Sequence, residues 1–234
     1  MVLGLIFAFA AVLFGAIAAL CGGIAWLLLW PAASAAVVSL GYLALGARVL
    51  GKRSDGGFPP WAKALHTPYF LFSEGFFRGY RAGHRDEETR TEICPGLFVG
   101  GRPAGHEAVV LAQTAVLDLT TEFDGAELRR VAGAYRTLPM LDEAVPSFSE
   151  FEAAMAWLEG LPRPWLIHCA FGHGRSVMVA SGVLVRTGEA ASHEEALAAI
   201  KARRPLVRLR ARQLAFLREA EARGLLRRRP SQIA

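Results

Sequence analysis

The stretch from Trp165 to Val177, WLIHCAFGHGRSV, places a thiol between an apolar run and a glycine-broken loop that ends in an arginine. The continuous apolar run and the prolines before it predict a buried strand that ends at Cys169. The apolar segment that follows predicts a helix that begins near Arg175 and is closed by Gly188. A strand, a short loop and a helix in this order are typical of an α/β domain.

The loop after Cys169 has the composition of an anion-binding site. Gly172 and Gly174 permit tight curvature and a close approach of the backbone to a ligand. Backbone N–H groups in such a loop, together with a helix amino terminus, bind anions. The planar guanidinium of Arg175 can bind two oxygens of a tetrahedral dianion, which a lysine cannot do. The predicted phosphate-binding residues are Ala170, Phe171, Gly172, His173, Gly174 and Arg175.

The position of Cys169 within this loop predicts a catalytic role. The positive field of the loop favours the thiolate over the thiol. A thiolate beside a bound phosphate is a nucleophile aimed at phosphorus. The sequence therefore predicts a hydrolase of phosphate monoesters, and we expect it to need neither a metal nor another cofactor.

The motif HCAFGHGRS, His168 to Ser176, resembles the signature of the cysteine-dependent protein tyrosine and dual-specificity phosphatases, which is His-Cys, five residues, Arg, then Ser or Thr. The resemblance covers roughly residues 96–223, including GLFVGGRP, VLDLTTEF and EEALAAIKARRP. It implies a dual-specificity-phosphatase-like fold and a phosphocysteine intermediate. Rhodaneses, whose cysteine loop is usually one residue shorter, and arsenate-reductase-like phosphatases, whose loop opens the domain, fit less well.

The resemblance also implies roles for the residues around the loop. In the family, the residue that matches His168 orients the loop and tunes the thiol, and the one that matches Ser176 donates a hydrogen bond to the thiolate when the phosphocysteine is hydrolysed. His173 stands where phosphoinositide 3-phosphatases carry a lysine, and Ala170 replaces their other loop lysine. This departure argues against a highly charged inositol headgroup as the substrate.

A general acid must protonate the leaving oxygen. Dual-specificity enzymes carry an aspartate for this about 30 residues before the cysteine, and the segment LPMLDEAVPS places Asp142 27 residues before Cys169. We expect Asp142 to be the acid, with Glu143 as the alternative and a solvated surface pair as a third interpretation. Asp118, at the end of a predicted strand, is expected to be structural.

Two further residues have open interpretations. Gln213 is expected on the surface of the last helix, with a role in the site as the alternative. Cys94 is a second thiol of the same domain, and a disulfide with Cys169 under oxidation is a possible state.

From Ile93 onward, short apolar strands alternate with helical segments. The strands are expected within GLFVGGRP, TAVLDLT and WLIHC, and the helices at 147–161, 175–188, 192–204 and 210–224. Strands alternating with helices predict a mostly parallel sheet flanked by helices on both faces. The catalytic domain is expected to be 93–234.

The first 50 residues predict a hairpin of two transmembrane helices. No charged residue precedes Arg48, and Val2 to Trp30 is almost wholly apolar. Because a membrane-spanning helix needs about 20 apolar residues, this segment suits two spans with a break near Pro31 to Ser34. One long tilted span, and a removed or soluble segment, are the alternatives.

Charge after the hairpin predicts its orientation. Arg48, Lys52 and Arg53 follow the second span directly, and positive charge near span ends marks the cytoplasmic side. We expect an integral protein of the bacterial inner membrane with its catalytic domain in the cytoplasm. Three cysteines do not form a disulfide framework, which agrees with that compartment.

Residues 51–92 are expected to connect the hairpin to the catalytic domain. Phe58 to Tyr80 contains eight aromatic residues. Tyr69, Phe72, Phe76 and Tyr80 fall near one helical face, which is typical of an amphipathic helix at the membrane interface. The alternative is an extra helix packed on the catalytic core. Ala82 to Glu92 is polar and predicts a solvated linker.

Lys201 to Arg229 holds eleven lysines and arginines and only two glutamates. Next to membrane spans, anionic lipid headgroups are the expected partner of this basic segment, with a plain solvated helix face as the alternative. Charge alone also permits nucleic acid, which we do not expect as a partner.

The substrate is open between two classes. The family that the motif resembles includes a mitochondrial phosphatidylglycerophosphate phosphatase. A phosphorylated lipid of this kind is therefore the preferred substrate for a domain tethered at a bilayer. A phosphoprotein carrying phosphotyrosine, phosphoserine or phosphothreonine is the alternative. A non-catalytic membrane adaptor that binds phosphate is the third interpretation.

Overall fold

The computed structural model describes residues 2–103, 107 and 111–227. The chain forms two compact units, Met1–Arg85 with Thr121–Ala126, and Asp86–Thr120 with Glu127–Ala234. The first unit therefore includes a short loop, Thr121–Ala126, from within the segment that the sequence assigns to the catalytic domain.

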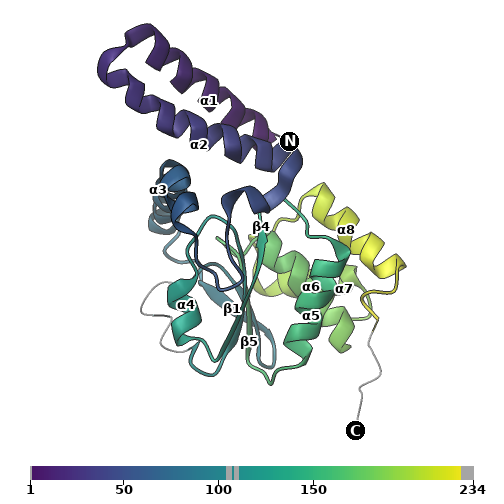
Figure 1. Cartoon of the computed structure of the whole chain (residues 1–234). Coiled ribbons are helices and arrows are strands. Elements are labelled where there is room, and N and C mark those ends of the chain that lie inside the picture. Colours follow the sequence, from purple (N-terminus) through teal and green to yellow (C-terminus); the bar gives the residue numbers. More distant parts are fainter. Residues whose placement is uncertain (1, 104–106, 108–110, 228–234) are drawn as a thin grey trace. The chain divides into compact units, whose positions relative to one another are not determined.

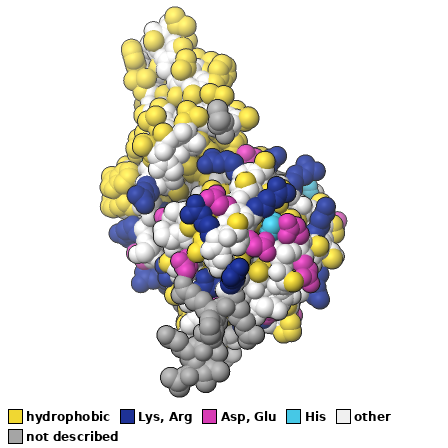
Figure 2. Space-filling view, turned by 90° about the vertical axis from the view of Figure 1, so that its right-hand side faces the viewer, with side chains coloured by type: hydrophobic (Ala, Val, Ile, Leu, Met, Phe, Trp, Pro, Cys, Tyr) yellow, Lys and Arg dark blue, Asp and Glu magenta, His cyan; other side chains and the backbone are white. Residues whose placement is uncertain are grey.

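The first unit begins with a helical hairpin. Helix α1 (Val2–Cys21) is followed by the 3₁₀ helix η1 (Gly23–Leu28), α2 (Leu29–Leu40), a π-helical turn η2 (Gly41–Leu45) and the 3₁₀ helix η3 (Gly46–Leu50). The two stretches 2–21 and 23–50 are long and apolar enough to cross a membrane by length and composition. Hydrophobic side chains cover the hairpin surface (Figure 2).

The predicted break near Pro31 to Ser34 is wrong, because the chain reverses at Gly22 and Gly23. These two glycines have φ angles of 62° and 53°, which residues with a side chain rarely adopt. Pro31 lies in the first turn of α2, where a missing backbone N–H leaves no intrahelical bond unmade. Across the hairpin, the Ser39 hydroxyl donates a hydrogen bond to the Gly4 carbonyl at 2.8 Å.

The aromatic connector forms α3 (Pro60–Gly83) in the same unit. Its buried stripe runs through Ala62, His66, Tyr69 and Phe77. Tyr69 is thus buried, with its ring 5.5 Å from that of Phe7 in α1. Phe72 and Phe76, which the sequence placed on the same face, are each 61% exposed beside exposed Leu71. The predicted aromatic face is therefore divided between packing and exposure.

The loop Thr121–Ala126 packs within this first unit. The ring of Phe123 lies 5.4 Å from that of Phe77 in α3. The Gly125 N–H donates to the Gly56 carbonyl at 2.8 Å, and Lys63 lies 3.1 Å from Asp124.

The second unit contains a five-stranded sheet in the order β1-β2-β5-β3-β4. Its strands are β1 (Arg90–Cys94), β2 (Leu97–Gly100), β3 (Ala115–Thr120), β4 (Ala134–Met140) and β5 (Trp165–His168). Only the β1–β2 pair is antiparallel. The predicted mostly parallel α/β sheet is confirmed. The two strands that the sequence did not predict, β1 and β4, are the edges of the sheet.

Helices flank both faces of the sheet, as predicted (Figure 1). On one side, α5, α6, α7 and α8 bury the main core, in which Leu117, Phe151 and Val179 are fully enclosed. On the other side, Leu128 of α4 packs with Val116 and Leu166. The bounds are α4 (Ala126–Val131), α5 (Phe148–Glu159), α6 (Arg175–Thr187), α7 (His193–Arg203) and α8 (Ala211–Ala222).

The carboxyl ends of β2, β3, β4 and β5 lie at one edge of the sheet, because these four strands are parallel. Open α/β sheets bind ligands outside this edge. The thiol of Cys169 directly follows the end of β5 and precedes α6, so the fold places the predicted loop where such ligands bind.

Candidate active site

The loop between β5 and α6 is held from both sides by backbone hydrogen bonds. The Cys169 N–H donates to the Gly100 carbonyl at 3.2 Å, and the Arg102 N–H donates to the Ala170 carbonyl at 3.0 Å. On the other side, the Arg208 N–H donates to the His173 carbonyl at 3.0 Å. The end of β2 and the segment between α7 and α8 therefore fix the loop.

The thiol of Cys169 is 3% exposed and faces the inside of the loop. The Gly172 N–H donates to its Sγ at 3.3 Å, and the Ser176 hydroxyl lies 3.4 Å from the same sulfur. Donors to sulfur stabilise negative charge on it. The arrangement therefore suits a thiolate, and it brings together the nucleophile and the hydroxyl that the sequence assigned to it.

Gly172 is required by the packing of the loop. Its φ of +82° is in the left-handed region, and a Cβ there would lie 2.6 Å from the Gly100 carbonyl carbon and 2.7 Å from the Gly101 nitrogen. Both are backbone atoms and cannot move aside. Only glycine fits at this point.

Arg175, the first residue of α6, is buried but reaches two groups at the end of β4. Its Nη1 donates to the Met140 carbonyl at 2.8 Å, and its Nε lies 3.5 Å from an Asp142 carboxylate oxygen. The Asp142 side chain is 59% exposed. The structure therefore brings the predicted general acid beside the predicted phosphate-binding arginine.

His168 lies behind the loop in a buried polar network with Asp118. Its Nε2 is 3.7 Å from Asp118 Oδ1. That oxygen accepts hydrogen bonds from the backbone N–H and the hydroxyl of Thr120 at 2.8 and 2.7 Å. The Tyr135 hydroxyl donates to the other carboxylate oxygen at 2.7 Å. Asp118 thus occupies the structural position that the sequence predicted, and it faces the histidine beside the nucleophile.

The fold matches those of solved phosphatases. The structure of Tk-PTP in the active form superposes with a TM-score of 0.53 at 25% identity, covering 58% of this chain and 97% of that one. This domain has the fold of the protein tyrosine phosphatase superfamily and is a phosphatase domain of that kind.

Two further structures share the fold of the phosphatase domain. PTPMT1 in complex with PI(5)P has a TM-score of 0.50 at 20% identity, covering 58% of this chain and 99% of that one. The human tyrosine phosphatase-like serine/threonine/tyrosine-interacting protein has a TM-score of 0.51 at 21% identity, covering 58% and 97%. Comparison with protein-family models and with curated sequences gives no match.

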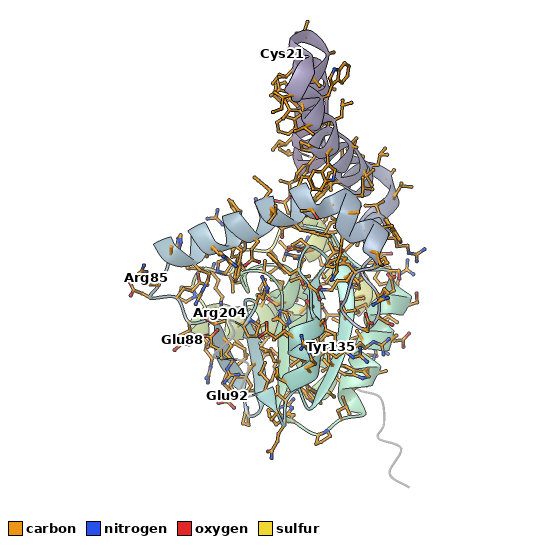
Figure 3. All side chains as sticks on the ribbon, turned by 60° about the vertical axis from the view of Figure 1, so that its left-hand side comes forward. Cys21, Arg85, Glu88, Glu92, Tyr135 and Arg204 are labelled. Carbon is orange, nitrogen blue, oxygen red and sulfur yellow. The ribbon has the colours of Figure 1, made fainter. Side chains whose placement is uncertain are left out.

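His173 of the phosphatase loop contacts Glu87, which the sequence placed in a solvated linker. The Glu87 carboxylate lies 2.5 Å from His173 Nε2 and 3.1 Å from Arg204 Nη2. Arg204 is buried and also donates to the Glu88 carbonyl at 3.1 Å (Figure 3). The linker prediction is wrong for Glu87, since this side chain is only 13% exposed and borders the loop.

The expectation that Gln213 lies on the surface of the last helix is also wrong. Gln213 is 1% exposed, not a surface residue of α8. Its Oε1 accepts the Arg210 N–H at 3.0 Å, and a Cβ on Gly174 would lie 3.3 Å from the same oxygen. The signal in the sequence is its third position in the helix, from which a glutamine caps the start of α8.

The sheet register excludes the disulfide considered for Cys94. Cys94 pairs with Leu97, which lies beside Trp165 at the start of β5, whereas Cys169 follows the far end of that strand. Four strand residues span about 13 Å, and a disulfide needs Cα atoms within about 7 Å. Both cysteines are free, and burial raises the pKa of the Cys94 thiol.

One group of side chains among the described residues has metal-ligand geometry. His193, Glu194 and Glu221 bring their ligand atoms within 4.8 Å of one another. They belong to α7 and α8 and do not contact the catalytic loop in any described interaction.

Proposed function

We propose that this protein is a membrane-anchored, cysteine-dependent phosphatase that hydrolyses a phosphate monoester of a lipid, such as phosphatidylglycerophosphate. The observation that carries the chemistry is the loop geometry, in which Cys169 receives a backbone N–H beside the buried guanidinium of Arg175. The arrangement suits a tetrahedral dianion and a sulfur nucleophile.

In the first step, the Cys169 thiolate attacks phosphorus while Arg175 and the loop N–H groups hold the phosphoryl oxygens. A bond forms between sulfur and phosphorus as the bond from phosphorus to the leaving oxygen breaks. The Asp142 carboxyl transfers its proton to that oxygen, so the alcohol leaves neutral and the cysteine carries the phosphoryl group.

In the second step, water attacks the phosphocysteine. The Asp142 carboxylate takes a proton from the water as the new bond to phosphorus forms. The bond between phosphorus and sulfur breaks, and the Ser176 hydroxyl, 3.4 Å from the sulfur, donates a hydrogen bond to the departing thiolate. Inorganic phosphate leaves, and thiolate and acid return to their starting states.

The first unit supports a lipid substrate. The hairpin exposes large hydrophobic side chains along its length, and α3 exposes Leu71, Phe72 and Phe76. Surfaces of this kind are unfavourable in water and favourable in a bilayer and its interface. With Arg48, Lys52 and Arg53 after the second span, we place the hairpin in the bacterial inner membrane and the phosphatase domain in the cytoplasm.

The phosphatase domain adds a basic surface near its catalytic loop. Lys201, Arg203, Arg208 and Arg212 are exposed, and the backbone of Arg208 bonds to that of His173 in the loop. Anionic headgroups are attracted to such a surface. Arg228 and Arg229, which the sequence counts with this segment, lie outside the described residues.

Two features support a headgroup with few phosphates. Ala170 has no charge, and the imidazole of His173 lies against the carboxylate of Glu87. PTPMT1, which shares the fold, has been crystallised with PI(5)P, so this fold accommodates a phospholipid headgroup.

The test is a substrate panel with the full-length protein in vesicles containing anionic lipid. Phosphatidylglycerophosphate, a phosphotyrosine peptide, a phosphoserine peptide and an aryl phosphate are each assayed for phosphate release. We expect lipid turnover to exceed peptide turnover, and salt to reduce the lipid rate because it screens the basic surface. Strong peptide hydrolysis without lipid hydrolysis would identify a phosphoprotein phosphatase. Phosphate binding without any turnover would identify an adaptor.

A further inference from the structure

Glu143, the residue that follows Asp142, has an unusual backbone conformation. Glu143 has a φ of 61° and is the only non-glycine residue with a positive φ among those that the structure describes. Left-handed backbone is unfavourable for a long side chain and easier for glycine or asparagine. A glutamate at this position is therefore uncommon, and its side chain makes a specific interaction.

That interaction is an ion pair with the segment that supports the catalytic loop. The Glu143 carboxylate lies 2.8 Å from Arg210 Nε. The Arg210 N–H donates to Gln213 Oε1, the buried amide beside Gly174. Two residues earlier, the Arg208 N–H donates to the His173 carbonyl. The segment from Arg208 to Gln213 thus contacts the phosphate loop and the acid-bearing segment at once.

We propose that Glu143 and Arg210 are positioning residues for Asp142, an inference that rests on the proposed role of Asp142 as the general acid. Their ion pair, together with the left-handed turn at Glu143, holds the Asp142 carboxylate beside Arg175. From there its proton can pass to the leaving oxygen as the bond between that oxygen and phosphorus breaks. Glu143 itself transfers no proton.

Because the Glu143–Arg210 ion pair is exposed, its role in positioning Asp142 can be distinguished from a contribution to stability. The Glu143 and Arg210 side chains are 36% and 59% exposed, and exposed ion pairs add little to stability. Small displacements of a catalytic group, by contrast, strongly reduce the rate. Loss of the pair should therefore change proton transfer while leaving the folded state intact.

The test compares two substrates in the full-length protein. An alkyl phosphate has a poor leaving group and needs the proton, whereas 4-nitrophenyl phosphate has a good one and needs it less. We expect Arg210→Gln and Glu143→Gln to lower kcat on the alkyl phosphate about tenfold, and on 4-nitrophenyl phosphate by less than about twofold. Arg210→Lys, which keeps the cation, should recover part of the loss.

Two further variants complete the experiment. Glu143→Gly suits the left-handed backbone but removes the carboxylate, so it should match Glu143→Gln. Arg78→Gln is the control, because it removes another exposed Arg–Glu ion pair, with Glu74, within α3 of the first unit. It should leave both rates unchanged. Melting temperatures of all variants should stay near that of the wild type.

The outcomes separate this inference from the proposed acid. Suppose that Asp142→Asn lowers kcat much more on the alkyl phosphate than on 4-nitrophenyl phosphate, while the Arg210 variants match the wild type. Asp142 then remains the acid, and the positioning role is overturned. If the Arg210 variants lose kcat equally on both substrates, or melt at a lower temperature than the wild type, the positioning role is also overturned. If Asp142→Asn itself loses equally on both substrates, the assignment of the acid fails. A selective loss in Glu143→Gln that no Arg210 variant reproduces would make Glu143 the acid.

Discussion

At the scale of single residues, Cys169 is deeply buried, and its sulfur accepts the Gly172 N–H and lies beside the Ser176 hydroxyl. A serine in its place would keep the loop but carry a hydroxyl that stays protonated at neutral pH. We expect Cys169→Ser to abolish phosphate release from 4-nitrophenyl phosphate while still binding orthovanadate or phosphate. Calorimetric titration of the variant measures that binding. Hydrolysis at the wild-type rate would rule out a covalent cysteine mechanism.

Arg175 offers a sharper test of geometry. Its Nη1 donates to the Met140 carbonyl and its Nε lies 3.5 Å from Asp142, so both contacts fix the plane of the guanidinium. A lysine keeps the charge but not the planar fork. We expect Arg175→Lys to lose roughly a hundredfold or more in kcat/KM for an aryl phosphate. A rate near that of the wild type would argue against a tetrahedral dianion as the ligand.

The residues of the site differ in how readily the sequence predicts them. Cys169, Arg175 and Ser176 lie within one short segment, so a strand, a loop and a helix suffice to bring them together. Glu87 and Gln213 reach the same loop from distant segments through tertiary packing. The polar stretch around Glu87 contains no local sign of its burial. The third helical position of Gln213 indicates a cap of α8 but not that the amide is buried beside the loop.

At the scale of elements, the meeting of the catalytic loop with the end of β2 depends on Gly172. An alanine would place its Cβ 2.6 Å from the Gly100 carbonyl carbon and also strain the backbone at φ +82°. We expect Gly172→Ala to lose most of the activity and to destabilise the domain by about 1 kcal/mol or more. Activity assays and urea unfolding measure the two effects.

Gly160→Ala is the matched control for that variant. Gly160 ends α5 with a φ of −76°, and a Cβ there would lie 3.6 Å from its nearest neighbour, the Ala156 carbonyl oxygen. This is an ordinary contact, so activity and stability should stay close to the wild type. Equal damage in the two variants would mean that the fit of Gly172 is not the cause.

The central strands are easier to predict from the sequence than the edge strands. Every residue of β3 and β5 is buried, which gives short continuous apolar runs such as WLI. The edge strands β1 and β4 are partly exposed, so they mix polar and apolar residues without strict alternation. Their pairing depends on neighbours that no local pattern specifies. Because Asp142 follows β4, its place in the site depends on a strand that the sequence did not predict.

At the scale of the whole molecule, the hairpin turn provides a test of membrane topology. Cys21 is exposed and lies directly before the Gly22–Gly23 turn, at the end of the hairpin (Figure 3). If both helices span the membrane with the phosphatase domain in the cytoplasm, Cys21 faces the opposite side. We expect a membrane-impermeant maleimide added to intact spheroplasts to label the full chain, and Cys21→Ser to remove that label.

The other two cysteines make this test selective. Both belong to the phosphatase domain, so the predicted orientation keeps them in the cytoplasm, where an impermeant reagent added to intact spheroplasts does not reach them. Lysed spheroplasts of the Cys21→Ser variant show the residual labelling of these two thiols. Labelling of Cys21 only after lysis would contradict the predicted orientation, or the spanning of the membrane altogether.

The first unit draws its residues from two separate parts of the chain, and this has a consequence for the evolution of the protein. Thr121–Ala126 contributes Phe123 and Gly125, which contact Phe77 and Gly56 of the amino-terminal segment. A chain in which residues 1–85 alone were exchanged would leave this loop with partners that it does not fit. Changes in α3 and in this loop are therefore expected to have accumulated together.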